Sequence, residues 1–293
     1  MGTVINVCGP SFSGTTMLEL MLANSPTGFC CGEVAFWYRP LHGGHRRIDC
    51  SCGAAPCPVW PRLLQVSPHR LHAEILRTQG VELATDSSKR LSWTIDVNRW
   101  AGRGQFRVVN CAIWKQPAAY VHSHWKRGAP LDTALRRYVR YYQRLLETGL
   151  PLITVNYEQL VQNPAECLHA VCLAAGIDYF PGKEAFWRRT QHQLYGNQGT
   201  RRQLGREDGG IQAAEQFCEE FHHQWRAVGS QLTASPWQHV LSSLVRRDVL
   251  HGPPPAAAHR PRWIQPPWYY RQRLHDGLRR AFRWYRPLPQ PGT

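Results

Sequence analysis

The sequence predicts an α/β fold in which a central parallel sheet is flanked by helices. The first observation is a strand, a loop and a helix in direct succession. The β-branched, apolar run 3–8 (TVINVC) ends at Gly9, and the apolar stretch 17–23 (MLELMLA) follows it. The second is that such runs recur at 82–85, 106–113 and 150–155, each followed by a polar turn and a helix-like stretch. Strands that alternate with helices favour parallel pairing, because each crossover carries a helix.

Two longer segments have a helical pattern. Residues 131–148 are predicted to form one helix and residues 211–232 another, the second with one apolar face made by Ile211, Ala214, Phe217, Cys218 and Phe221. The Pro-rich stretch 252–255 can sustain neither a helix nor a central strand, so the domain is expected to cover residues 1–250. Residues 251–293 are then a Pro- and Arg-rich C-terminal extension, in which 268–285 is expected to form a short helix.

The charge is strongly unbalanced. The chain has 35 Lys and Arg against 20 Asp and Glu, a net charge of +15 and a pI of about 9.7, which predicts an anionic partner. For the Arg-rich extension two interpretations stay open: a peripheral membrane or acidic-partner contact, or a basic tail without such a role. No nucleic acid is expected, because no recognition motif accompanies the charge.

Location and cysteine usage follow from the apolar runs. None of them approaches the roughly 18 residues that cross a bilayer, and residues 1–8 do not resemble a signal peptide, so a cytoplasmic protein is expected. Its ten cysteines are then expected to be reduced thiols. Cys50, Cys52 and Cys57 have C-x-C-x4-C spacing rather than the C-x2-C pairs of most zinc sites. A structural role is favoured for them, and no metal is expected.

The loop after the first predicted strand is the strongest local signal. Residues 9–16 (GPSFSGTT) lie before a helix, where backbone N–H groups and the helix dipole form an anion site. The spacing fits the P-loop pattern GxxxxGK[ST], except that Thr15 stands at the lysine position. The absent charge disfavours a conventional ATPase or GTPase. A glycine-rich turn that merely starts a helix is the alternative.

This loop resembles that of the sulfotransferases that use 3′-phosphoadenosine 5′-phosphosulfate (PAPS). In that family a loop of the form [K/R]SG[ST]T binds the 5′-phosphosulfate, and here it reads FSGTT. The resemblance implies a P-loop-like sulfotransferase fold with PAPS as the donor substrate. It assigns the following residues to the donor: Ser11, Ser13, Gly14, Thr15 and Thr16.

Three later elements extend the resemblance. A strand followed by a basic residue and, eight positions on, a serine holds the 3′-phosphate in the family, and Lys115 and Ser123 match it. The turn YEQLV, which begins at Tyr157, matches a YEDLV-like turn whose tyrosine borders the adenine. A late loop of the form HxxxGNxxR implies that Arg201 or Arg202 contacts the 3′-phosphate. A basic surface turn is the alternative for these two arginines.

The catalytic candidates are Glu33 and Lys89. Gly32-Glu33 follows Phe12 by about twenty residues, as a Gly-Glu pair does in protein-tyrosine sulfotransferases and bacterial relatives, where the glutamate is the base. A carboxylate near the sulfuryl group is able to accept the proton of an attacking hydroxyl. Lys89 ends a DSSK segment of the bacterial relatives, which implies that it stabilises charge on the sulfuryl group or the departing bisphosphate. Without the resemblance these two residues read as a surface carboxylate and a solvated turn lysine.

One departure from the family concerns Phe12, which replaces the basic residue of the loop. Lys89 alone, or one of Arg39, Arg46 and Arg47, is expected to supply the charge. The predicted reaction is sulfuryl transfer from PAPS to a hydroxyl of a small molecule, glycan or lipid, without a metal. The alternatives are a non-catalytic nucleotide-binding relative and a P-loop kinase-type phosphotransferase. The aromatic residues near Glu33 line an acceptor pocket or belong to the core: Phe36, Trp37, Tyr38 and Trp60.

Overall fold

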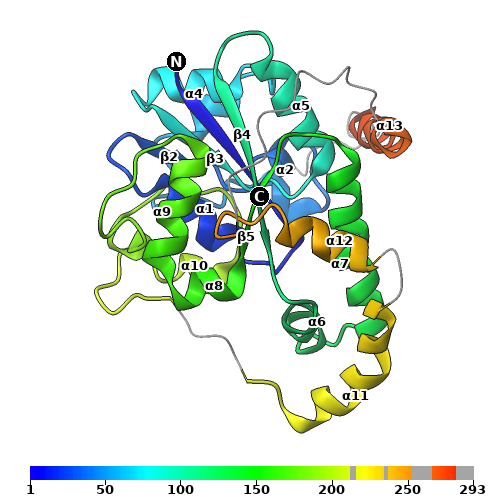
Figure 1. The fold of residues 1–293 in the computed structure, drawn as a ribbon. Coiled ribbons are helices and arrows are strands. Elements are labelled where there is room, and N and C mark those ends of the chain that lie inside the picture. Colours follow the sequence, from blue (N-terminus) through cyan, green and yellow to red (C-terminus); the bar gives the residue numbers. More distant parts are fainter. Residues whose placement is uncertain (212–215, 234–236, 252–265, 282–293) are drawn as a thin grey trace, which may run out of the picture.

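The computed structural model describes residues 1–211, 216–233, 237–251 and 266–281 (Figure 1). Its centre is a five-stranded parallel sheet in the order β2-β3-β1-β4-β5. In chain order the strands are β1 (Thr3–Cys8), β2 (Gly28–Cys30), β3 (Leu83–Asp86), β4 (Arg107–Trp114) and β5 (Ile153–Asn156). The predicted α/β class, with a parallel sheet flanked by helices, is confirmed.

Helices cover both faces of this sheet (Figure 1). The first half of the chain forms α1 (Thr15–Ala23), α2 (Ala35–Tyr38), α3 (Trp60–Leu63), α4 (Leu71–Thr78), α5 (Leu91–Ala101), α6 (Pro117–Trp125) and α7 (Leu131–Glu147). The second half forms α8 (Tyr157–Gln162), α9 (Pro164–Ala175), α10 (Gln198–Arg201), α11 (Glu219–Gly229), α12 (Trp237–Val245) and α13 (Pro267–Ala281). Short 3-10 turns lie at Gly43–Arg46, Phe186–Arg188 and Ser230–Thr233.

The central strand β1 shows why its sequence is apolar at nearly every position. All six of its residues are buried, because both faces of a parallel sheet are covered by helices. Ile5 and Val7 pack against α1 and α9 on one face. Val4 and Cys8 belong to two clusters that contain α4, α5 and α7. The side chains therefore alternate between two helical layers, as the period of a strand requires.

Two predicted elements differ from the structure. The helix predicted at 211–232 begins only at Glu219, and residues 212–215 lie outside the described residues. Cys218 has an extended backbone, and Glu219 with Glu220 in the first turn favours a helix start, because carboxylates stabilise the positive end of a helix dipole. The strand predicted at 150–155 forms at Ile153–Asn156, beyond Pro151, which cannot donate to a ladder.

The last described parts of the chain return to the domain. Val249 N donates to Thr154 O at 3.0 Å, so residues 247–249 line the outer edge of β5. Helix α13 lies within the extension predicted for 251–293, and its Tyr269 is buried against α5. The predicted linker at 252–255 and residues 282–285 lie outside the described residues. No helix in the described part of the chain is long and apolar enough to span a membrane.

Candidate functional site

The loop after β1 lies where the direction of the sheet's connections changes. From β1 the chain builds β2 and β3 on one side of the sheet and then β4 and β5 on the other. At such a point the crevice at the carboxyl ends of the strands is the usual ligand site of open α/β sheets. Gly14 has φ 100°, and a Cβ atom there would stand 2.4 Å from the ring of Tyr157. Only glycine fits this position, which brings the loop against the turn after β5.

Backbone donors of this loop remain available for an anion. Helix α1 begins at Thr15, and the N–H groups of Gly14, Thr15 and Thr16 donate to no acceptor among the residues that the structure describes. Ser13 turns its hydroxyl inward and donates to Pro10 O at 2.8 Å. Thr16 Oγ1 accepts from Asn197 N at 3.0 Å, which joins the loop to the segment before α10. The first turn of α1 therefore has the donors of an anion cradle.

Glu33 and Lys89, the two predicted catalytic residues, are in contact. Lys89 Nζ donates to Glu33 Oε1 in an ion pair whose side chains are 13% and 11% exposed. Glu33 follows Gly32, whose φ of 70° and closeness to the Leu194 backbone leave no room for a Cβ atom. The sequence separates the two residues by 56 positions, and Lys89 lines a cavity that Pro10 and Ser11 of the loop also line.

A cavity of about 490 Å³ opens beside this pair, a size typical of small-molecule sites. Lys89 and Ser11 line it together with two further cations, Arg90 and Arg137. Its apolar and aromatic walls and its rim are formed by Pro10, Phe36, Leu41, Tyr120, Tyr141 and Gln272. Of the four aromatic residues predicted for an acceptor pocket, Phe36 lines this cavity. Trp60 is fully buried in the core, and Trp37 and Tyr38 pack against the same core cluster.

His124 is a cavity residue that the sequence did not single out. It lies on α6 and is 6% exposed, and its Nε2 atom has no hydrogen-bond partner in the described structure. Burial and the nearby charge of Arg137 lower the pKa of His124, which favours the neutral imidazole. No motif marks this residue, because α6 brings it to the loop only in the folded chain.

The loop position of Phe12 is not charged, but a cation stands over it. The guanidinium of Arg127 lies 4.1 Å from the centroid of the Phe12 ring, and His124 meets the ring edge-on at 5.0 Å. The expectation that Arg39 reaches the loop is wrong, because Arg39 forms a buried ion pair with Asp96 at 2.5 Å. Arg47 is exposed, and the side chain of Arg46 lies outside what the structure describes.

The residues predicted for the 3′-phosphate and the adenine lie beyond the loop. Lys115 follows β4 directly, and its ammonium stands 4.0 Å from the centroid of the Tyr157 ring. Ser123 lies on α6 and donates its hydroxyl to Ala119 O at 3.0 Å within the helix. The fold therefore brings Lys115 and Tyr157 together at Gly14. The hydroxyl of Ser123 is hydrogen-bonded within its own helix.

The two arginines of the late loop have different surroundings. Arg201 is buried and forms a two-pronged pair with the carboxylate of Asp49, with both N–O distances at 2.9 Å. Arg202 is exposed, and its side chain makes no hydrogen bond or ion pair with the described residues, while its backbone N–H donates to Gln198 O at 3.0 Å. Arg201 therefore holds the segment around Asp49, while the side chain of Arg202 is exposed.

Glu19 is a second residue that the sequence missed. It is fully buried on α1 and accepts hydrogen bonds from Gly32 N at 2.7 Å, Ser87 Oγ at 2.6 Å and Gln193 Nε2 at 2.7 Å. Burial raises the pKa of Glu19 to about 7. This carboxyl group ties three segments together directly behind Glu33, and its position in an apolar helix gave no sign of that.

Comparison with known proteins identifies the fold. No family model matches the sequence, and no curated protein does. The sulfotransferase domain from the curacin biosynthetic pathway has a similar structure, with a TM-score of 0.50 and 12% identity over 78% of this chain and 98% of that chain. The sulfotransferase domain from the Synechococcus PCC 7002 olefin synthase matches at a TM-score of 0.49 and 16% identity, over 84% of this chain and 94% of that one.

A third similar structure is the sulfotransferase from Alicyclobacillus acidocaldarius, with a TM-score of 0.43 and 12% identity over 83% of this chain and 96% of that chain. The likeness to the curacin-pathway domain shows the fold. The chain has the P-loop-like sulfotransferase fold that the sequence predicted.

Proposed function

We propose that this chain is a sulfotransferase that moves the sulfuryl group of PAPS to an acceptor hydroxyl. The observation that supports the proposal most is the Glu33–Lys89 ion pair, because a carboxylate and a cation are in contact beside a cavity that Pro10 and Ser11 of the loop also line. Neither the loop nor the pair alone would distinguish sulfuryl transfer from other chemistry at a P-loop-like site.

The donor fits the loop through its anionic groups. The N–H groups of Gly14, Thr15 and Thr16 would bind the 5′-phosphosulfate end, because a helix N-terminus favours negative charge. Lys115 and Arg202 are the cations proposed for the 3′-phosphate, with Ser123 and Tyr157 bordering the nucleotide. Arg201, which pairs with Asp49, would act by holding this side of the site. The scheme needs no metal in the reaction.

The transfer itself is an in-line displacement. The acceptor oxygen forms a bond to sulfur while its proton passes to the Glu33 carboxylate. The bond between sulfur and the phosphate-bridging oxygen breaks, and 3′-phosphoadenosine 5′-phosphate leaves with the electron pair. Lys89 would stabilise the negative charge that develops on the oxygens of the sulfuryl group and the leaving phosphate.

The charge that Phe12 does not supply has local substitutes. Lys89, Arg90 and Arg137 line the cavity, and Arg127 stands over the Phe12 ring. A guanidinium that lies on an aromatic face keeps its positive charge and still attracts a nearby anion. We therefore favour an active enzyme over a non-catalytic nucleotide-binding relative.

The acceptor is proposed to bind in the cavity of about 490 Å³. Aromatic walls from Phe36, Tyr120 and Tyr141 suit an apolar or sugar-like molecule that carries a hydroxyl. A small molecule, a glycan or a lipid headgroup meets this description. Contact with a membrane surface or an acidic partner remains a proposal for the Arg-rich end of the chain.

Donor binding is tested by thermal shift. The bisphosphate product 3′-phosphoadenosine 5′-phosphate should raise Tm more than ATP does at equal concentration, because Lys115 and Arg202 are proposed to bind a 3′-phosphate, which ATP lacks. Equal shifts, or none, would contradict the proposal. A larger effect of ATP together with Mg²⁺-dependent hydrolysis would favour a kinase-type phosphotransferase instead.

Catalysis is tested by incubating the protein with PAPS and a panel of hydroxyl compounds and detecting sulfated products by mass spectrometry. Phe12→Arg serves as the comparison variant. Activity in the native protein supports the proposal. Activity only after Phe12→Arg would instead identify the native chain as a nucleotide-binding relative that has lost catalysis.

A further inference from the structure

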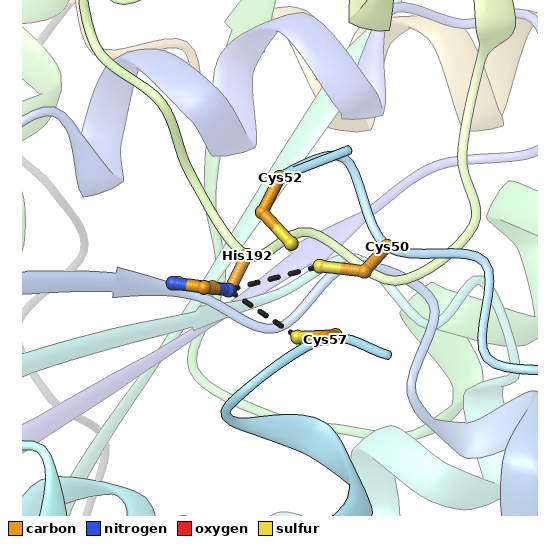
Figure 2. Close-up of side chains that lie close together, drawn as sticks. All are labelled: Cys50, Cys52, Cys57 and His192. Atoms are coloured by element: carbon orange, nitrogen blue, oxygen red, sulfur yellow. Dashed lines mark hydrogen bonds between the residues drawn. The ribbon is translucent and has the colours of Figure 1, made fainter. Parts of the chain in front are cut away.

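Three cysteines and a histidine meet near the backbone bridges that join Leu194 to Gly32 and to Cys50. Cys50, Cys52 and Cys57 lie in the segment between the Gly43–Arg46 turn and α3, and His192 lies far along the chain, 135 residues beyond Cys57. Figure 2 shows their side chains converging, with the three sulfur atoms and the imidazole directed at one point. The four candidate ligand atoms all lie within 4.8 Å of one another.

The measured separations suit a four-coordinate metal. Zn–S bonds of about 2.3 Å and Zn–N bonds of about 2.0–2.1 Å at tetrahedral angles require S–N edges of about 3.6 Å and S–S edges of about 3.8 Å. His192 Nδ1 lies 3.5 Å from Cys57 Sγ and 3.8 Å from Cys50 Sγ. These two distances lie close to the S–N edge of such a tetrahedron, and the remaining separations are within 4.8 Å.

The surroundings fix the ligands in place. The Trp60 indole donates to the backbone oxygen of His192, and the Phe29 ring stacks on the imidazole at 6.3 Å with an interplanar angle of 9°. Ser51 Oγ donates to Gln191 O and accepts from Gln193 N at 2.9 Å. Hydrogen bonds on both sides of His192 thus hold it against the cysteine segment, as supporting contacts orient metal ligands in known sites.

The donor set decides between metals. Three thiolates and one imidazole are soft to borderline ligands, which suit Zn²⁺ and exclude the oxygen-seeking Ca²⁺ and Mg²⁺. A disulfide would use only two of the three sulfurs and would leave the histidine without a reason to be there. All ten cysteines are free thiols in the structure. The C-x-C-x4-C spacing argued against a metal from sequence because the fourth ligand was not visible in it.

We propose that Cys50, Cys52, Cys57 and His192 bind a zinc ion. With four protein ligands the site is closed, so its role is structural. Zinc binding would displace the thiol protons and fasten segment 49–57 to segment 191–195.

The segment held by the zinc ion contacts the backbone of the proposed base, Glu33. Leu194, two residues after His192, accepts from Glu33 N at 2.8 Å and donates to Cys31 O at 3.3 Å. Asp49, next to Cys50, pairs with Arg201. Loss of the metal would therefore loosen the backbone that positions Glu33 and the loop that carries Arg202.

The experiment measures metal directly and does not depend on sulfotransferase activity. Purified, reduced full-length protein is analysed for metal by mass spectrometry, then stripped with a chelator and titrated with Co²⁺. About one zinc per chain is expected, together with the visible absorption of tetrahedral cobalt and its thiolate charge-transfer bands. A reduced protein that binds neither Zn²⁺ nor Co²⁺ would overturn the proposal, as would a disulfide within the cluster in freshly purified protein.

Variants then assign the ligands. Cys52→Ser, at a half-buried position, should lower zinc content well below stoichiometric and weaken the cobalt charge-transfer bands. The exposed Cys218→Ser is the matched control and should bind as the native chain does. Stoichiometric zinc in Cys52→Ser, or an equal loss in Cys218→Ser, contradicts the assignment. The cobalt titration of the native protein decides the matter even if Cys52→Ser fails to fold.

Discussion

The helix that follows the loop after β1 and the segment that carries the cysteine cluster both connect to Gly32, but the loop and the cluster are assembled differently. The loop takes all its donors from one continuous segment, residues 9–16, which the backbone places at the end of β1. The cluster joins segments 135 residues apart and is held by tertiary contacts. The first arrangement puts the proposed donor site on a local motif, and the second holds the backbone next to Glu33 through long-range contacts. Substitutions of Glu33 and Lys89 should therefore change turnover. Substitutions in the buried long-range contacts around them should change stability.

Glu33→Gln should have the largest effect. It removes the proton acceptor but keeps the shape of the side chain, and its amide oxygen still accepts from Lys89. Turnover with PAPS should fall by about 10³-fold, within the range of general acid–base catalysis. Tm and the shift caused by 3′-phosphoadenosine 5′-phosphate should be retained, since Glu33 is not placed among the donor-binding residues.

Exposed Glu207→Gln makes the same chemical change elsewhere and is the control for this variant. His124→Asn tests whether the neutral imidazole at the cavity, whose Nε2 has no partner in the described structure, acts as the base instead. Unchanged turnover in Glu33→Gln, with a loss only in His124→Asn, would move the base to α6. The catalytic centre would then lie at α6 rather than at the Glu33–Lys89 pair.

Lys89→Met is the next largest effect. It keeps most of the aliphatic stem and removes the ammonium that contacts Glu33 and lines the cavity. Loss of one preorganised donor lowers kcat by about 10²–10³-fold. The exposed Lys126→Met is the control. A loss confined to the KM for PAPS would assign Lys89 to donor binding in the ground state.

The buried carboxyl group of Glu19 should make the stability of the protein depend on pH. The pKa of Glu19 is about 7 in the folded protein against an ordinary 4.5, so the folded state holds an extra proton between these pH values. Its contribution to stability is complete below about pH 4.5 and is lost as pH rises through about 7. The loss amounts to about 3 kcal/mol of unfolding free energy. Denaturation followed from pH 5 to pH 8 measures it.

Glu19→Gln should flatten this profile. A glutamine holds its amide protons at all pH values, and Gln193 Oε1, which has no partner among the described residues, is able to accept one of them. Glu207→Gln should retain the native slope. If Glu19→Gln keeps the full slope, another titrating group causes it.

The difference between these two sides explains what the sequence could predict. β1, the loop and Lys115 follow from local patterns, since apolar runs and glycine spacing specify a strand and a turn within a few residues. Glu19 could not be predicted as a buried carboxyl, because its partner Gln193 lies 174 residues away. The sequence showed His192 only as part of a loop and not as a neighbour of the cysteines. Strand β2 was not predicted, because its three residues, Gly28–Cys30, are too few to give a strand pattern. Long-range partners carry no local signal.

The smallest expected effect concerns helix α13. This helix comes from the far end of the chain and supplies Gln272 to the lining of the cavity. Tyr269 OH donates to Asp96 Oδ1 at 2.7 Å and accepts from Arg99 Nη1 at 3.0 Å. Tyr269→Phe should lower the unfolding free energy by about 1 kcal/mol and leave kcat unchanged, as measured by urea denaturation and PAPS turnover. Tyr270→Phe, at a neighbouring tyrosine that is 60% exposed, should have no effect. Equal results for the two variants would mean that α13 does not dock on α5 in solution, and the cavity would then be open on that side.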